Sequence, residues 1–332
     1  MLWEGIALAV DEINSEGGVL GRKIKMIKRD DEDSVEKAIV IAQELGENPD
    51  VVAVLGHYQS FITIPASVVY QYYGILLLST VCTHPDLTRQ GFPLVFRAVP
   101  NDEDYGNILG EFCQEKHYKR LVFYVGQNKY GHDFTSALAA ASLRYGLQIL
   151  DEESYDDFSG VSEFRRVLNH WKEHYSFDAI VLSGKLPQAG IIIREARELG
   201  LEKPIIVGVA LDRKELLTIL GKEVKDVFLP TDFDPHSKKT EVQNFVKAFQ
   251  KRHGKTPGVL ASHGYDTIYT LAYAIEHANS TSPPKMADAL RAIENLKVTT
   301  GAMHFSQSGD RILEYVCIKM VENGQFKYLH TE

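Results

Sequence analysis

The stretch RLVFYVGQNKYG at residues 120–131 decides the fold class. Its first half, Arg120 to Val125, is a short run rich in β-branched and aromatic residues, which is typical of a buried strand. A polar loop follows, and an amphipathic segment of helical length comes next. This order recurs along the chain, and it is the pattern of parallel sheets with crossover helices, so the sequence predicts an α/β fold. The other strands predicted on this pattern are Ile24 to Arg29, Val51 to Leu55, Ile75 to Leu78, Ala179 to Leu182 and Ile205 to Gly208.

Length and composition limit the classes of function. The chain has 332 residues, 44% of them hydrophobic, which is enough for two sizeable cores and favours two lobes. A net charge of -9 without any basic run argues against a nucleic-acid partner. No apolar run is long enough to predict a membrane span, and the first residues have a helical pattern instead of that of a signal peptide. The cysteines, which are Cys82, Cys113 and Cys317, lack the paired spacing of a zinc or redox site. No GxxxxGKS or GxxxxGKT loop and no strand-linked GxGxxG motif occurs either, so neither metal nor cofactor is expected.

The strand–helix alternation is interrupted at three places. The first is Val99-Pro100-Asn101-Asp102, the second runs from Leu229 to Pro235, and the third precedes a final strand pair, Tyr315 to Met320 and Gln325 to Leu329. Three breaks predict three connecting strands between two lobes. The predicted N-terminal lobe comprises residues 1–100 and 233–302, and the predicted C-terminal lobe comprises residues 101–232 and 303–332.

Polar loops follow the predicted strands at the edge where α/β proteins bind ligands. The loop after Val51 to Leu55 contains Tyr58 and Ser60, and the helix that starts there offers free amides to an anion. The loop after Ile75 to Leu78 contains Val81, Cys82 and Thr83, which add a hydroxyl and main-chain groups. The sequence therefore predicts that both loops hold a ligand carboxylate.

The predicted second lobe offers two loops of the same kind. One contains Tyr130, an aromatic residue suited to cover an apolar ligand body, and the other runs from Ser183 to Pro187 and contains Lys185. Each of these loops, taken alone, also fits an ordinary solvated loop or helix cap. Their common position at one edge is what favours a ligand site.

Two enzyme hypotheses arise from the residues. His170, Glu173 and His174 match the HxxEH spacing of a zinc peptidase, in which two histidines one helical turn apart share a metal. They lie at the end of a helix leading into the strand at Ala179, which places them at the opposite edge of the sheet, so a solvated helix face is favoured over a zinc hydrolase. Cys82 has the chemistry of a nucleophile, but no flanking residue supplies a base, and a buried thiol is favoured.

Several separate motifs resemble one known family. They are Ala9 to Asn14 with Gly17-Gly18, Asp30-Asp31, Gly56-His57 with Pro65 to Ser67, Thr83 to Thr88, Tyr130-Gly131, Ala196 with Leu199 to Leu201, Tyr265-Asp266 and Gly309-Asp310. The chain resembles the type I periplasmic solute-binding proteins of branched-chain amino acid ABC transporters. That resemblance implies two Rossmann-like, doubly wound lobes joined by three hinge strands, which close over an amino acid without chemical change. It also implies a monomer outside the cytoplasm that delivers its ligand to an ABC permease, although the same architecture serves as a sensing domain for a receptor kinase or chemoreceptor.

The resemblance assigns roles to individual positions. It places the ligand carboxylate on Ser60 and Thr83 with main-chain groups near Val81 and Cys82, and it has Tyr130 and the Lys185 loop close from the second lobe. The acidic residue that receives the ligand ammonium in leucine-binding members falls near Ala210, where the nearest carboxylate is Asp212, with Asp102 and Asp266 as further candidates. An amino acid or a related small carboxylate is therefore the expected ligand. The family's first strand has no counterpart, because this sequence begins inside the first helix.

Overall fold

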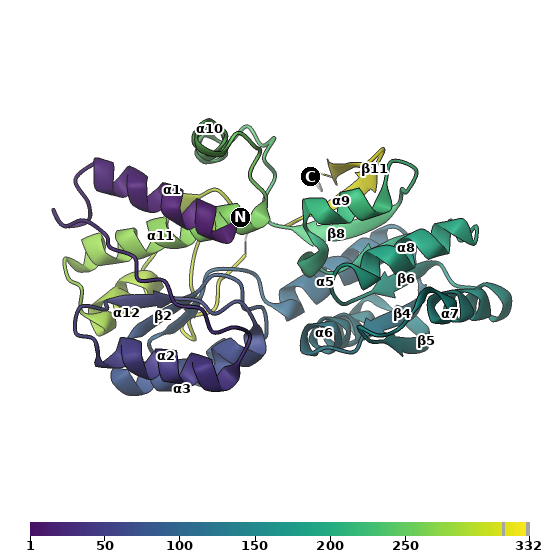
Figure 1. The fold of residues 1–332 in the computed structure, drawn as a ribbon, viewed down its shortest axis with the longest axis horizontal. Helices are drawn as coiled ribbons and strands as arrows, with labels where there is room; N and C mark the ends of the chain where they lie inside the picture. Colours follow the sequence, from purple (N-terminus) through teal and green to yellow (C-terminus); the bar gives the residue numbers. More distant parts are fainter. Residues whose placement is uncertain (314–315, 330–332) are drawn as a thin grey trace. The chain divides into compact units, whose positions relative to one another are not determined.

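The chain folds into two compact α/β units. The computed structural model describes residues 1–313 and 316–329. Unit 1 consists of Met1–Asn101 and Asp232–Tyr315, and unit 2 consists of Asp102–Thr231 and Val316–Glu332 (Figure 1). The chain therefore passes from one unit to the other three times, after residues 101, 231 and 315. Each unit has its own sheet and its own hydrophobic core.

Unit 1 is built on a three-stranded parallel sheet in the order β1-β2-β3. Successive side chains of β2 point to opposite faces of the sheet and pack in two separate cores. Leu76 and Leu78 pack against α1, α11 and α12, whereas Leu77 packs against α2 and α3. Figure 1 shows these two groups of helices on either side of β2. The elements are α1 (Leu2–Ser15), α2 (Val35–Glu47), β1 (Ala53–Leu55), α3 (Ser60–Tyr73), β2 (Leu76–Ser79), α4 (Asp86–Arg89), β3 (Val95–Arg97), α10 (Thr240–His253), α11 (Val259–Ala278), α12 (Pro283–Arg291), β9 (Leu296–Val298) and β10 (Gly301–Met303).

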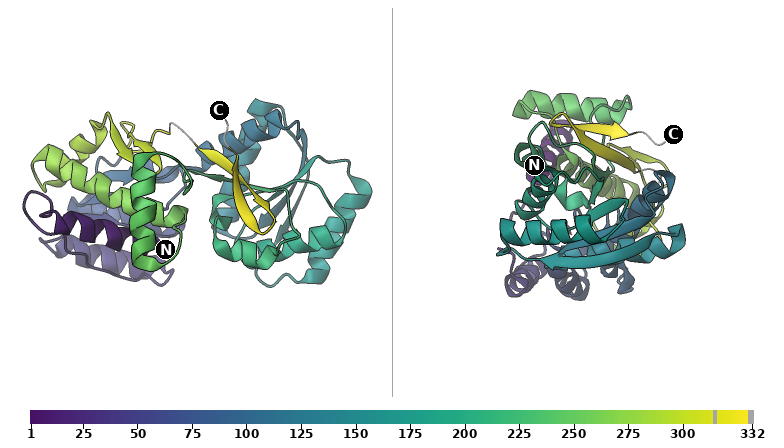
Figure 2. Two further views of the ribbon diagram at one scale, coloured as in Figure 1. Left: turned by 90° about the horizontal axis from the view of Figure 1, so that it is seen from above. Right: turned by 90° about the vertical axis from the view of Figure 1, so that its right-hand side faces the viewer.

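Unit 2 is built on a seven-stranded sheet in the order β12-β11-β8-β7-β6-β4-β5. Its last two strands form an antiparallel hairpin, and β11 pairs antiparallel with β8, so the end of the chain completes the sheet (Figure 2). Helices α5 and α6 cover one face, and α7, α8 and α9 cover the other. The elements are α5 (Asp102–Glu115), β4 (Arg120–Gly126), α6 (Lys129–Tyr145), β5 (Gln148–Tyr155), α7 (Val161–His174), β6 (Ala179–Leu182), α8 (Gln188–Glu198), β7 (Ile205–Val207), the 3-10 turn η1 (Val209–Leu211), α9 (Lys214–Leu220), β8 (Val227–Thr231), β11 (Cys317–Glu322) and β12 (Gln325–Leu329).

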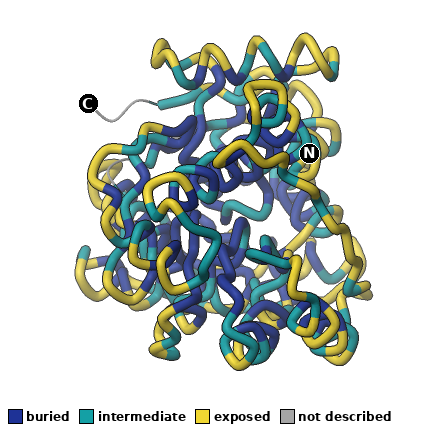
Figure 3. The backbone as a smooth tube through the Cα atoms, turned by 90° about the vertical axis from the view of Figure 1, so that its left-hand side faces the viewer, coloured by how far each residue is buried: buried dark blue, intermediate teal, exposed yellow. Residues whose placement is uncertain are grey.

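Burial follows this layering. Most of the central strands and the inner faces of the helices are buried, whereas β5 and β12 are partly exposed and the outward turns are exposed (Figure 3). Among the described residues, no helix is both long enough and apolar enough to cross a membrane.

The strand predicted over Ile24 to Arg29 is not formed. Its first residue instead pairs with a side chain: the Ile24 N–H donates to Asn14 Oδ1 at 2.7 Å, and Asn14 Nδ2 donates to the Ile24 carbonyl at 2.9 Å. An apolar run becomes a strand only where a neighbouring strand accepts its ladder of hydrogen bonds, and this run has an amide side chain for a partner at its start. The segment therefore remains extended chain without a place in the sheet.

The predicted boundary at residues 302 and 303 is also wrong, because residues 303–313 belong to unit 1. Met303 and Phe305 are buried in the unit 1 core, and the Phe305 ring meets the Phe96 ring edge-on at 5.4 Å. The first residue of the predicted strand Tyr315 to Met320 lies outside the described residues, and β11 begins at Cys317.

Candidate functional site

Two polar loops of unit 1 lie at one edge of its sheet. β1 and β2 run parallel, with Leu55 opposite Leu78, so the loops that follow them emerge side by side. Ser60 is half-buried and is the first residue of α3, where the first amides of a helix have no intrahelical acceptor. Tyr58, two residues earlier, is 42% exposed. This edge therefore has the donors that an anion needs.

The loop after β2 offers less of its main chain than expected. Thr83 is 8% exposed and Val81 is half-buried, but the Cys82 side chain is completely buried in the core beneath α2 and α3. The Cys82 N–H donates to Ser79 Oγ at 3.2 Å, and its carbonyl accepts from Arg97 at 3.3 Å. Cys82 therefore contributes to the shape of the loop, and its thiol is not placed to act as a nucleophile.

A hydrogen-bonded Asp–His–Tyr network, in which the His and Tyr are buried and the Asp is partly exposed, supports the loop after β1, and sequence reasoning missed it. His57 Nδ1 lies 2.6 Å from Asp31 Oδ2, and its Nε2 lies 3.0 Å from the Tyr70 hydroxyl. Burial, with the charge of Asp31, raises the pKa of Tyr70 above its ordinary value. The three residues come from the loop before α2, the loop before α3 and α3 itself, so they fix the segment that leads to Ser60. The motifs Asp30-Asp31 and Gly56-His57 were the only signal of this hydrogen-bonded network in the sequence.

In unit 2, the structure brings two predicted residues together. The Tyr130 hydroxyl accepts a hydrogen bond from the Ala210 N–H at 3.2 Å, which joins the start of α6 to the turn after β7. Gly208 allows this approach, because a Cβ atom there would lie 2.3 Å from the Tyr130 oxygen. The Tyr130 ring also stacks on Phe134 at 6.1 Å, so its position is fixed from two sides.

Lys185 lies at the same edge of the unit 2 sheet, in the exposed part of the loop after β6. The loop is anchored at Ser183, whose Oγ accepts from the Gly126 N–H at 3.3 Å and whose carbonyl accepts from the Tyr155 hydroxyl at 2.6 Å. The end of β4 and the end of β6 are thus tied together beneath Lys185.

Two of the three carboxylates predicted to accept a ligand ammonium group form ion pairs or hydrogen bonds within the fold instead. Asp212 forms a buried ion pair with Lys319 of β11, with side-chain exposures of 4% and 3%. Asp266 is 2% exposed and accepts four hydrogen bonds of 2.7 to 2.9 Å from the main-chain and hydroxyl groups of Thr299 and Thr300. Asp102 is the first residue of α5, in the acidic first turn of that helix. Two of the three predicted carboxylates are therefore neutralised or satisfied within their own unit.

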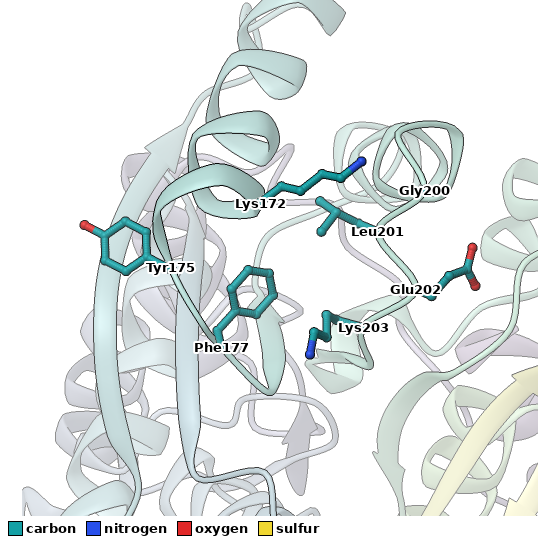
Figure 4. Close-up of a pocket in the computed structure, with 7 residues that line it drawn as sticks. All are labelled: Lys172, Tyr175, Phe177, Gly200, Leu201, Glu202 and Lys203. Carbon is teal, nitrogen blue, oxygen red and sulfur yellow. The ribbon is translucent and has the colours of Figure 1, made fainter.

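The zinc-peptidase hypothesis finds no support in the geometry. His170 and His174 lie on the exposed last turn of α7, where His174 Nδ1 is 3.0 Å from the His170 carbonyl. Among the described residues, no group of three or more His, Cys, Asp and Glu side chains could hold a metal. A pocket does lie close by, at the amino ends of β6 and β7 (Figure 4). Tyr130 and Lys185 follow the carboxyl ends of β4 and β6, at the opposite edge of the sheet. The pocket is lined by Lys172, Tyr175, Phe177 and residues 200–203, and none of the three predicted zinc ligands lines it.

Two α/β units that present loops at the carboxyl ends of parallel strands, on a chain that passes between them three times, define a bilobal solute-binding protein of the type I architecture. The chain belongs to the periplasmic binding protein family, whose sequence profile matches residues 1–322.

Known relatives align with almost the full length of this chain. The Leu/Ile/Val-binding protein homolog 1 of Brucella abortus is 28% identical over 333 aligned residues, which cover 99% of this chain and 88% of the relative. An ABC transporter substrate-binding protein from Desulfitobacterium hafniense, solved in complex with Leu, is 32% identical with a TM-score of 0.87, covering 99% of this chain and 95% of that one. The leucine-binding protein LivK from Thermotoga maritima is 25% identical with a TM-score of 0.88, covering 99% and 93%.

Proposed function

We propose that this protein is an extracytoplasmic solute-binding protein, which captures an amino acid or a related small carboxylate and delivers it, chemically unchanged, to an ABC permease. The observation that carries the proposal is that Ser60, at the start of α3, and the loop that contains Thr83 lie at the same edge of the unit 1 sheet, where the first amides of the helix are suited to an anion. The substrate-binding protein from Desulfitobacterium hafniense that was solved with Leu supports the ligand class.

The proposed ligand contacts come from both units. On unit 1, Ser60, Thr83 and the Val81 main chain hold the carboxylate, and Tyr58 borders it. On unit 2, Tyr130 and the turn at Ala210 contact the ligand body, and Lys185 borders the site. Asp102 is the proposed carboxylate for an ammonium group, because Asp212 is compensated by Lys319. In this proposal the protein acts as a monomer.

Isothermal titration calorimetry of the refolded protein tests the proposal directly. Refolding removes any ligand carried through purification. The panel comprises leucine, isoleucine, valine, an aromatic acid and the deaminated analogue of leucine. At least one small carboxylate is expected to bind with a dissociation constant in the micromolar range or tighter, with one ligand per chain. An absence of heat for every member of the panel would sink the proposal.

Ser60→Ala tests the carboxylate anchor. Loss of a charge-assisted hydrogen bond is expected to weaken carboxylate binding by about 1 to 3 kcal/mol. Ser282→Ala is the matched control, because Ser282 precedes helix α12 of the same unit and its side chain makes no capping hydrogen bond. Equal affinities of Ser60→Ala and the control would show that the anchor lies in another loop.

A further inference from the structure

Arg97 is a completely buried arginine at the end of β3, directly beside the loop after β2. This loop, residues 81–88, contains Thr83 and is called the ligand loop below. The Arg97 guanidinium donates to the carbonyl of Cys82 at 3.3 Å, to the carbonyl of His84 at 2.6 Å and to Thr88 Oγ1 at 3.0 Å. Three points of residues 82–88 therefore converge on one side chain. The shape of this loop, which contains Thr83, depends on the position of that guanidinium.

The other side of the same guanidinium contacts the segments that lead out of unit 1. Arg97 Nε donates to Asp310 Oδ1 at 2.7 Å, and Asn101 Nδ2 donates to Asp310 Oδ2 at 3.1 Å. Asn101 is the last residue of unit 1 before the first passage to unit 2, and Asp310 lies shortly before the third passage. One ion pair, in which Arg97 is fully buried and the Asp310 side chain is 23% exposed, thus joins the loop after β2 to two of the three connecting segments.

Asp310 is held in place by its own turn. The Arg97 N–H donates to the Gly309 carbonyl at 2.9 Å, and the Asp310 N–H donates to Ser306 Oγ at 3.1 Å. Gly309 has a φ of +86°, and a Cβ atom there would lie 2.3 Å from the Val95 carbonyl oxygen, so only glycine fits this approach. This close contact fixes Asp310 against β3.

A second buried arginine, Arg311, forms a hydrogen bond with the remaining connecting segment. Arg311 donates to the Ala98 carbonyl at 3.1 Å and to Asp232 Oδ2 at 3.3 Å. Asp232 is the first residue of unit 1 after the second passage, and it also pairs with His263 at 2.8 Å. All three connecting segments are therefore anchored to unit 1 by two neighbouring arginines, and only Arg97 also contacts the ligand loop.

We propose that Arg97 and Asp310 form a positioning pair that couples the ligand loop after β2 to the connecting segments of the chain. This inference rests on the proposed function, because it takes residues 81–88 as ligand-contacting. Packed interiors transmit displacements, and a hydrogen-bonded charge pair in low dielectric is a stiff link. Ligand contact at Thr83 therefore stabilises the segments at residues 98–101 and 310–313, and a weakened pair lets the ligand leave faster.

Asp310→Asn is the test variant, because it keeps the shape of the side chain and removes its charge, whereas replacement of the fully buried Arg97 threatens folding. The first measurement is hydrogen exchange of the ligand-free protein. Faster exchange is expected at residues 82–88 in Asp310→Asn than in wild type. Unchanged exchange there would overturn the proposed coupling, whatever the ligand proves to be.

The second measurement is the dissociation rate of leucine by stopped flow. The rate is expected to rise about tenfold in Asp310→Asn, as for the loss of a hydrogen bond to a charged group. Arg197→Lys is the matched control, because Arg197 also holds main-chain carbonyls, at Leu201, Lys203 and Lys225 of unit 2. A dissociation rate in Asp310→Asn equal to that of the control would refute the coupling. If wild type binds no member of the ligand panel, the proposed function fails, and the exchange experiment still decides whether Asp310 supports the loop.

Discussion

Lys319→Met is expected to destabilise unit 2 strongly, because it leaves Asp212 buried without a cation. Both side chains are almost inaccessible, with exposures of 3% and 4%. Breaking such a pair from one side costs about 3 to 5 kcal/mol. Lys319 Nζ also lies 4.0 Å from the Phe326 ring centroid, a contact that the methionine sulfur partly replaces. The free energy of unfolding of unit 2 is therefore expected to fall by about 3 to 5 kcal/mol.

The double variant Asp212→Asn with Lys319→Met is expected to regain most of this loss. It removes both charges, and a neutral buried pair of similar volume is often as stable as the ion pair. The coupling energy from the double-mutant cycle is expected to be at least about 2 kcal/mol. Urea unfolding followed by fluorescence measures these quantities. A Trp3→Phe background leaves Trp171, which is fully buried in unit 2, as the reporter.

The same variants test whether Asp212 takes part in ligand binding. If Lys319 already compensates its charge, the double variant binds leucine with an affinity within about threefold of wild type, since no charge-assisted bond to the ligand is lost. A loss of affinity of more than about tenfold in the double variant would identify Asp212 as the ammonium acceptor. A loss of stability below about 1 kcal/mol in Lys319→Met would refute the reasoning about the buried pair.

Three further predictions concern stability and reactivity. Burial tends to raise the pKa of Asp232, but His263 and then Arg311 outweigh it and hold the pKa below its usual range. The ionised Asp232 is therefore expected to stabilise unit 1 above about pH 4, and this stabilisation is lost as the pH falls further. The urea midpoint of unfolding, measured between pH 3 and 6, should fall toward acid pH in wild type and fall less in Asp232→Asn. Asp266→Asn is expected to destabilise unit 1 by about 3 kcal/mol, because the new amide faces donors that the carboxylate accepted from, and an unfolding midpoint equal to wild type would contradict this. Burial raises the pKa of the Cys113 thiol to about 12, so iodoacetamide at pH 8 should leave Cys113 unmodified in the native protein and modify it after denaturation, as measured by mass spectrometry.

The sequence predicted the elements whose signal is local. The apolar run Ala179 to Leu182 is strand β6 to the residue, and the positions of the loops after β1, β2, β4 and β6 follow from the order of parallel strands. Ile24 to Arg29 failed because strand formation needs a neighbour, and the side chain of Asn14 is bound there instead. The same limit explains the boundary error at residue 303, where the burial of Phe305 against Phe96 decides the unit.

The partners of the charged residues lie beyond the reach of sequence spacing. Lys319 is separated from Asp212 by 107 positions, and Arg97 is separated from Asp310 by 213. The sequence around a carboxylate does not distinguish one that binds a ligand from one that a buried lysine neutralises. Tyr130 shows the opposite case, because its place at the start of α6 after β4 was sufficient to locate it at the carboxyl edge of the unit 2 sheet.

The β11–β12 hairpin also has a consequence for biosynthesis. Among the described residues, β8 forms its second ladder with β11, and β11 begins at residue 317, so the ribosome must translate beyond residue 317 before this sheet can close. Until then, β8 presents an unpaired edge of the kind that recruits other chains. Translation products that end before residue 317 are therefore expected to aggregate or be degraded, and unit 2 reaches its native state only after β11 and β12 have been synthesised.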